Sequence, residues 1–131
     1  MNRVIPLLLI AVCSASSAET PSQIGDSYAA IQGARFRATP ARGAEFFTRK
    51  FSVSEKFPSC STCHTENPME AGRHAITGKT IKPLSPVANT ERFTDPAKVE
   101  KWFRRNCKEV VGRECSADEK ANFIAFLAGG R

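Results

Sequence analysis

The chain has 131 residues, five cysteines and a net charge of +6 at pH 7. This length is enough for one domain with one modest hydrophobic core. The Lys and Arg residues are scattered, without a basic stripe carrying interleaved aromatic residues, which argues against a nucleic-acid-binding protein. Scattered positive charge fits either an ordinary solvated surface or a basic face for an acidic protein partner.

The first 18 residues have the pattern of a secretory signal peptide. A positively charged start precedes an apolar run over 4–12, and residues 16–18 are small, as at a cleavage site. The apolar run is too short to span a bilayer as a helix. Acylation of Cys13 is the alternative, which we rank lower because the preceding valine is larger than usual there. We therefore expect a signal peptide over 1–18, one domain over 19–131, and a periplasmic protein without stable membrane insertion.

Two short helices are predicted in the first third of the exported chain. Thr20-Pro21 and Thr39-Pro40 are each typical of a helix start, with an N-cap followed by proline at the first helical position. The first helix should end at Gly33, which interrupts its apolar periodicity. The second helix carries Gly43, followed four residues later by Phe47.

Residues 60–64 form a C-x-x-C-H motif, which is the attachment signature of c-type haem. The two thiols can bond to the two vinyl groups of one porphyrin, and His64 is then placed to bind the iron. A thioredoxin-like redox pair would not require His64 and would lie in a βαβ pattern, which we do not find. Half of a zinc site would need further ligands, and the two later cysteines are too far apart for one. We therefore predict one covalent haem c, attached through Cys60 and Cys63, with His64 as an axial ligand.

The segment from Pro58 to Pro96 is rich in proline and glycine, which argues against regular structure. We expect this segment to wrap the edge of the haem, which would supply the apolar centre that a short chain lacks. Arg73, Lys79 and Trp102 are predicted contacts of the haem propionates, because cations pair with carboxylates and an indole N–H can donate to one.

Two longer helices are predicted in the last third of the chain. Thr94-Asp95-Pro96 begins one, and Ser116 begins the other with an S-x-x-E capping box. Gly43 in the second predicted helix, together with Phe123 and Phe126 in the last one, resembles a pattern of the class I cytochrome c fold. In that fold, a glycine on the first core helix lets the last helix cross it closely. The expected fold is mostly α: a class I cytochrome c-like single domain with four main helices and long haem-wrapping loops.

Cys107 and Cys115 remain as an even pair in an oxidising compartment, which predicts a disulfide. Asn106 precedes the first of them and falls on the apolar face of the third predicted helix. A buried polar group needs a partner. Asn106 is therefore either the C-cap of this helix or a ligand of the iron.

Two other residues compete for the second axial position. Met69 is close to His64 in sequence, which makes the opposite face of the haem hard to reach. His74 lies in a Gly/Pro loop, where a histidine is usually solvated. Either residue would make the protein a six-coordinate electron carrier, whereas a weak or open position is typical of gas binding and catalysis.

The chain is similar to the sphaeroides haem protein family of small, secreted, high-spin c-type cytochromes. The resemblance runs from about Ile24 to the C-terminus, and its most specific part lies between Arg92 and Cys115. In class I cytochromes the second ring nitrogen of the haem histidine donates to a backbone carbonyl, and Pro83 marks the corresponding stretch here. The matching segments are 58–64, 77–79, 83–86, 92–95, 99–102, 105–107 and 112–115.

This resemblance implies a function and roles for two sites. Asn106 would be the sixth ligand of oxidised iron and leave on reduction, after which the ferrous iron binds O2 or NO. Cys107 and Cys115 would form the disulfide. Electrons would come from a dihaem c-type cytochrome, with a membrane cytochrome b upstream. His74 and the segment 66–69 are local differences that put a competing ligand near the site.

We therefore expect an electron-transfer and ligand-binding protein rather than a dedicated enzyme. The alternatives are a plain electron carrier, a haem enzyme that reduces O2, NO or peroxide, and a haem sensor or subunit of a larger complex.

Overall fold

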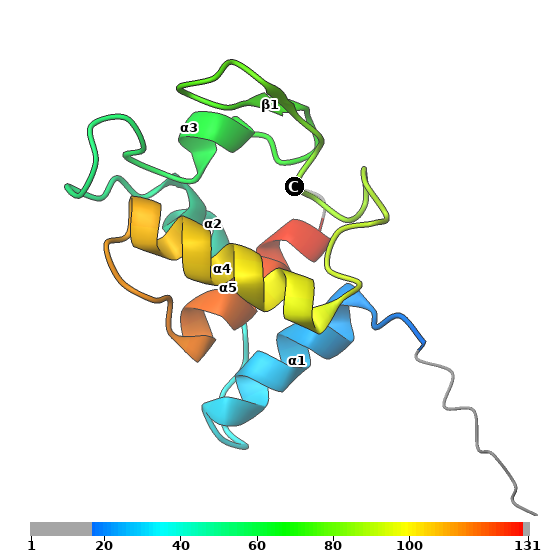
Figure 1. The fold of residues 1–131 in the computed structure, drawn as a ribbon. Helices are drawn as coiled ribbons and strands as arrows, with labels where there is room; N and C mark the ends of the chain where they lie inside the picture. Colours follow the sequence, from blue (N-terminus) through cyan, green and yellow to red (C-terminus); the bar gives the residue numbers. More distant parts are fainter. Residues whose placement is uncertain (1–16, 130–131) are drawn as a thin grey trace, which may run out of the picture.

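The computed structural model describes residues 17–129. Most of the predicted signal peptide, including Cys13, lies outside the described residues. The described chain forms five helices and one antiparallel strand pair (Figure 1): α1 Pro21–Ile31, α2 Pro40–Thr48, α3 Ser61–His64, β1 Gly72–Arg73, β2 Thr80–Ile81, α4 Pro96–Val110 and α5 Ala117–Ala128. No helix between residues 17 and 129 is long and apolar enough to cross a membrane.

The four main helices begin where the sequence predicts. Thr20, Thr39 and Asp95 each accept a hydrogen bond from a backbone N–H of the first turn, and Ser116 forms the capping box with Glu119. Such caps stabilise a helix by about 1 kcal/mol each. The mostly helical, class I-like fold is confirmed. The single turn α3 and the two-residue strands are additions within the segment expected to be loop.

The crossing of α2 and α5 forms the centre of the core. A Cβ atom at Gly43 would overlap the carbonyl oxygen of Asn122 and lie 2.6 Å from the Cβ of Phe126. Phe47 is fully buried, and its ring centroid lies 5.5 Å from that of Phe126 and 6.1 Å from that of Phe123. The close helix crossing predicted from Gly43 is therefore present.

Helix α4 presents two different faces. Val99, Phe103 and Cys107 are buried in the core. Trp102, which is 45% exposed, and Asn106 lie on the neighbouring face. The helix continues past Asn106 to Val110, so the C-cap interpretation of Asn106 is wrong, and its expected place on the buried apolar face is also wrong.

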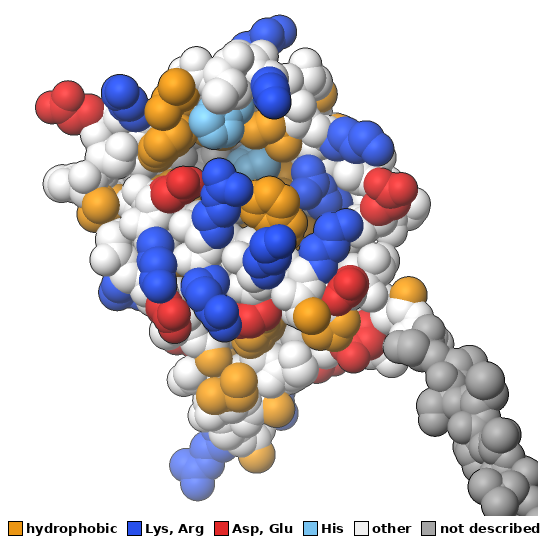
Figure 2. Space-filling view, viewed as in Figure 1, with side chains coloured by type: hydrophobic (Ala, Val, Ile, Leu, Met, Phe, Trp, Pro, Cys, Tyr) orange, Lys and Arg blue, Asp and Glu red, His pale blue; other side chains and the backbone are white. Residues whose placement is uncertain are grey.

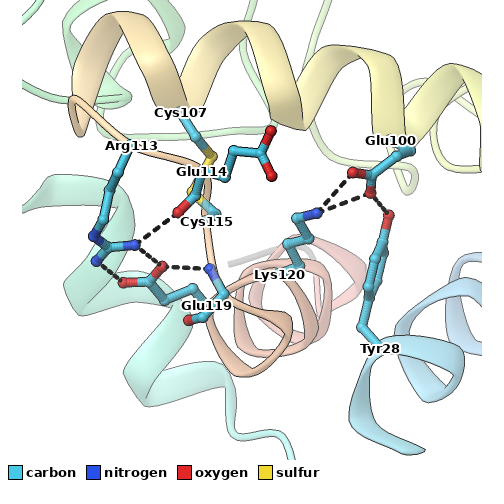
Figure 3. Close-up of a disulfide and its surroundings, with 9 residues drawn as sticks. Tyr28, Glu100, Cys107, Arg113, Glu114, Cys115, Glu119 and Lys120 are labelled. Carbon is cyan, nitrogen blue, oxygen red and sulfur yellow. Dashed lines mark hydrogen bonds and ion pairs between the residues drawn. A yellow bond between two sulfur atoms is a disulfide. The ribbon is translucent and has the colours of Figure 1, made fainter. Parts of the chain in front are cut away.

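The connection between α4 and α5 is held by a cross-link and by ion pairing (Figure 3). Cys107 and Cys115 are joined as a disulfide, with their Cα atoms 5.7 Å apart. Arg113 donates to both carboxylate oxygens of Glu119, at 2.8 and 2.7 Å. The hydrogen bond from Arg113 is the main reason that the pKa of Glu119 is lowered, and the backbone N–H of Ser116 adds to the effect. This end of α4 therefore has a fixed place beside α5.

A partly buried ion pair and a hydrogen bond together join three helices at the other half of α4 (Figure 3). Lys120 is only 9% exposed and donates to both carboxylate oxygens of Glu100, at 3.0 and 2.8 Å. The hydroxyl of Tyr28 donates to the same carboxylate at 2.7 Å. Burial alone would raise the pKa of Glu100, but these hydrogen bonds and the charge of Lys120 together lower it. The cluster ties α1 and α5 to α4.

Candidate haem site

The C-x-x-C-H motif folds into one helical turn. The buried hydroxyl of Ser59 lies 2.9 Å from the hydroxyls of both Ser61 and Thr62. The backbone N–H of His64 donates to the carbonyl of Cys60 at 3.2 Å. The turn therefore holds both thiols and the imidazole within one short segment, as attachment to a single porphyrin requires.

The strand β1 packs directly against this turn. A Cβ atom at Gly72 would overlap the carbonyl oxygen of Cys63 and lie 2.9 Å from the Cα of His64. The backbone N–H of Ala75 donates to the sulfur of Cys63 at 3.3 Å. The short strand pair thus supports the edge of the site where the thiols lie, and a glycine is required for its close approach.

A cavity of about 540 Å³ lies between this turn and α4. Both α3 and α4 contribute lining residues, and Figure 1 shows these two helices apart from each other. Its volume is within the range of about 300–1,000 Å³ that is usual for organic ligands. Cys60, Cys63 and His64 lie on one wall, and Trp102 and Asn106 lie on another. Much of the remaining lining is apolar and comprises Phe46, Phe57, Ile81, Leu84, Phe93, Val99, Phe103, Val110, Val111 and Phe123. This donor set in an apolar cavity fits one covalently attached haem.

The electrostatics of the turn suit the same chemistry. Burial, and then the positive charge of Arg92, lower the pKa of His64 to about 4. The imidazole is therefore neutral at pH 7, which is the form that binds iron. Before attachment, burial, and secondarily Cys63, raise the pKa of the free Cys60 thiol to about 11, so this thiol is protonated at pH 7 until it bonds to the porphyrin.

Asn106 lines the cavity from α4, whereas the motif lines it from α3 and the residue before it. Its carboxamide makes no hydrogen bond with any other residue in the described part of the chain, so its oxygen is available to a metal. Met69, by contrast, is not among the cavity-lining residues, and its backbone N–H donates to Asn67 at 3.1 Å.

His74 lines the cavity, but from the side of the thiols. Its neighbour Ala75 contacts the sulfur of Cys63, which places His74 beside the attachment edge. Its Nδ1 atom accepts hydrogen bonds from the backbone N–H groups of Ile76 at 3.3 Å and Thr77 at 3.2 Å. These bonds fix the imidazole within its own turn.

The three predicted propionate contacts are not brought together. Trp102 lines the cavity, whereas Arg73 and Lys79 are not among its lining residues. Arg73 instead donates to the carbonyl of Gly78 at 2.9 Å, within its own hairpin. A half-buried arginine that the sequence reasoning did not select, Arg92, lines the cavity. Its only sequence signal was its place in the family-like stretch 92–95.

The carbonyl of Pro83 also differs from the expectation. It accepts hydrogen bonds from Arg92 Nε at 3.0 Å and Asn89 Nδ2 at 3.4 Å. Among residues 17–129, no hydrogen bond joins this carbonyl to His64.

Comparison with known proteins places the chain among small c-type cytochromes. A family model described as a domain of unknown function, DUF1924, matches residues 33–127. The cytochrome c-type protein SHP of Cereibacter sphaeroides is 41% identical over 129 residues, which cover 98% of each chain. Cytochrome c'' of Methylophilus methylotrophus is 51% identical over 86 residues, which are 65% of this chain and 60% of that relative.

The fold agrees with solved structures of the same two proteins. The structure of oxidised SHP, an oxygen-binding cytochrome c, has a TM-score of 0.80 at 42% identity and covers 86% of this chain and 98% of that one. The crystal structure of oxidised cytochrome c'' has a TM-score of 0.75 at 39% identity and covers 85% and 94%. The chain therefore belongs to the DUF1924 family that includes the sphaeroides haem protein, and its cofactor is one covalently bound haem c.

Proposed function

We propose that the protein accepts electrons and binds a small diatomic ligand, O2 or NO, in the cavity between α3 and α4. Cys60 and Cys63 hold the haem covalently, and His64 is the permanent axial ligand. The observation that carries the proposal is Asn106, a carboxamide on α4 that lines the same cavity as the motif and has no hydrogen-bond partner in the described chain. The oxygen-binding relative SHP supports it.

The proposed release of Asn106 from the iron on reduction, which we call gating, follows from the chemistry of a carboxamide. Its oxygen is a hard, neutral and weak donor, which ferric iron accepts better than the softer ferrous iron does. The haem supplies an iron that changes between these two states and binds diatomic ligands when it is ferrous. Asn106 would therefore bind the iron in the oxidised protein and leave it on reduction.

The structure around α4 favours release of a side chain over movement of the helix. The ion pair of Glu100 with Lys120 lies six residues before Asn106, and the disulfide of Cys107 with Cys115 lies one residue after it. Because α4 is held on both sides of Asn106, rotation of the Asn106 side chain is the smallest movement that would free the second axial position of the iron.

The variant Asn106→Ala tests this role, with His74→Ala as the matched control in the same cavity. Asn106→Ala should retain the haem but change the ferric absorption spectrum, and cyanide should bind faster because no internal ligand has to leave. Binding of NO to the ferrous protein should change much less. If Asn106→Ala keeps the wild-type ferric spectrum while His74→Ala changes it, then His74 is the sixth ligand. That outcome would contradict the proposed release of Asn106 on reduction.

We also infer that the protein works in the periplasm, with 1–18 removed as a signal peptide and 19–131 remaining as one cytochrome domain. A dihaem c-type cytochrome would donate the electrons, with a membrane cytochrome b upstream. Figure 2 shows Lys and Arg side chains around the cavity opening, and Lys82, Lys98 and Arg105 line it. The same lining also holds Glu91, Asp95 and Glu109, and ion pairs join Lys82 to Glu91 and Arg105 to Glu109, so the rim carries mixed charge and does not by itself select an acidic partner. Mass spectrometry of the periplasmic protein and stopped-flow reduction by a purified dihaem cytochrome test these two statements.

A dedicated enzyme is the second candidate, because an open ferrous site can also react with what it binds. Steady-state turnover with O2, NO or peroxide under excess reductant separates the two functions. Binding without sustained turnover supports the ligand-binding protein, and turnover that far exceeds that of free haem supports the enzyme.

A further inference from the structure

Arg92 is a fixed cation in the wall of the haem cavity. Its Nε donates to the carbonyl of Pro83 at 3.0 Å, and its Nη2 donates to the carbonyl of Lys82 at 2.9 Å. Two bonds to successive carbonyls fix the plane of the guanidinium. The next residue, Phe93, has φ +57°, an unusual conformation for a bulky residue that marks this turn as constrained.

This cation has no carboxylate partner in the described part of the protein. A guanidinium has five N–H donors, and only two of those of Arg92 have protein acceptors among residues 17–129. The neighbouring carboxylate, Glu91, instead forms an exposed ion pair with Lys82 at 3.6 Å. Burial lowers the pKa of Arg92, and the charge of the neighbouring Glu91 only partly opposes this effect, so a carboxylate from a ligand would stabilise the half-buried cation.

The haem brings two carboxylates, its propionates, into this cavity. We propose that Arg92 binds a haem propionate through its free guanidinium donors and raises the reduction potential of the iron. The inference rests on the haem of the family and is independent of the gating by Asn106. Arginine can bind a carboxylate through two parallel N–H groups, which suits a donor whose plane is already fixed.

The effect on the potential follows from Coulomb's law. A positive charge near the iron stabilises the reduced state, which carries one more electron. The other cations that line the cavity, Lys82, Lys98 and Arg105, are exposed, so solvent and salt screen them more strongly.

The test compares Arg92→Gln with Arg105→Gln, which also removes one positive charge from the cavity lining but at an exposed position. Glutamine keeps an amide that can donate to the Pro83 carbonyl. The reduction potential of each holo-protein is measured in about 0.01 M and about 1 M salt, where the Debye length falls from about 30 to about 3 Å. We expect Arg92→Gln to lower the potential more than Arg105→Gln does, and to keep most of its shift at high salt. The shift of Arg105→Gln should nearly vanish there.

An unchanged potential in Arg92→Gln, or a shift that disappears with salt as in Arg105→Gln, overturns the inference. A crystal structure of the wild-type holo-protein tests it without any variant. A propionate oxygen within about 3.2 Å of the Arg92 guanidinium supports the inference, and both propionates on other residues overturn it. Either failure leaves the Asn106 proposal intact, because that proposal is tested by the ferric spectrum and by ligand binding.

Discussion

Replacing Gly43 by alanine puts a methyl group where another helix already lies. The new Cβ would overlap the carbonyl oxygen of Asn122 and lie 2.6 Å from the Cβ of Phe126, where ordinary contact begins at 3.4 Å. Because the nearest obstacle is backbone, it cannot rotate away. Helices α2 and α5 would have to separate by roughly 1 Å at the centre of a close-packed core.

The size of the effect can be estimated from two opposing contributions. Overpacking of a well-packed core costs about 1–3 kcal/mol, and a backbone obstacle places Gly43→Ala at the upper end. The higher helix propensity of alanine returns about 1 kcal/mol. The net loss in the free energy of unfolding is therefore about 2 kcal/mol. At about 4 °C per kcal/mol for a domain of this size, the Tm should fall by about 8 °C.

The assay is thermal unfolding of the oxidised holo-protein, followed by far-UV circular dichroism. Gly25→Ala in α1 is the matched control, because its Cβ would meet only the side chain of Ile124, at 3.3 Å for the nearest atom. This variant should stay within about 1 kcal/mol of the wild type. Equal Tm values for Gly43→Ala and Gly25→Ala would refute the reasoning from the helix crossing.

Replacing both Cys107 and Cys115 by serine should lower the free energy of unfolding, measured in a denaturant titration, by about 2–3 kcal/mol. The same variant should bind anions faster in its oxidised form. Unchanged values of both would show that the disulfide neither stabilises the fold nor positions Asn106. Glu100 has a lowered pKa, so its stabilisation should be complete above its ordinary value of 4.5 and be lost as the pH falls through the lowered value. The difference in unfolding free energy between the wild type and Glu100→Gln should therefore shrink only below about pH 4.5, and a constant difference down to pH 3 would contradict this. Acid–acetone extraction should leave the haem on the protein; loss of the colour would refute attachment through Cys60 and Cys63.

Local signals made most of the fold predictable. The caps at Thr20, Thr39, Asp95 and Ser116 depend on residues three positions away, so a short window of sequence contains them. Gly43 pointed to a close helix crossing because only glycine permits one. The C-x-x-C-H turn was equally local, since attachment chemistry requires that order of residues.

Long-range contacts were not predictable in the same way. Nothing near Lys120 distinguishes it from a surface lysine, because its partner Glu100 is 20 residues away and Tyr28 is 72 residues from Glu100. The role of Arg92 was not predictable because it depends on hydrogen bonds to the carbonyls of Pro83 and Lys82, which the loop conformation brings close to it. The helical periodicity of α4 predicted that Asn106 lies with the core residues, but in the structure it lines the cavity. Which residues reach the core depends on the rotation of the helix about its own axis, and periodicity alone does not determine that rotation.

The absorption spectrum of the wild-type holo-protein, recorded oxidised, reduced, and reduced with NO, tests the central claim most directly. A ligand that leaves on reduction predicts a high-spin, five-coordinate ferrous spectrum that changes at once when NO is added. A low-spin, six-coordinate ferrous spectrum that resists NO would contradict the account, because it would mean that the sixth position stays filled in both redox states.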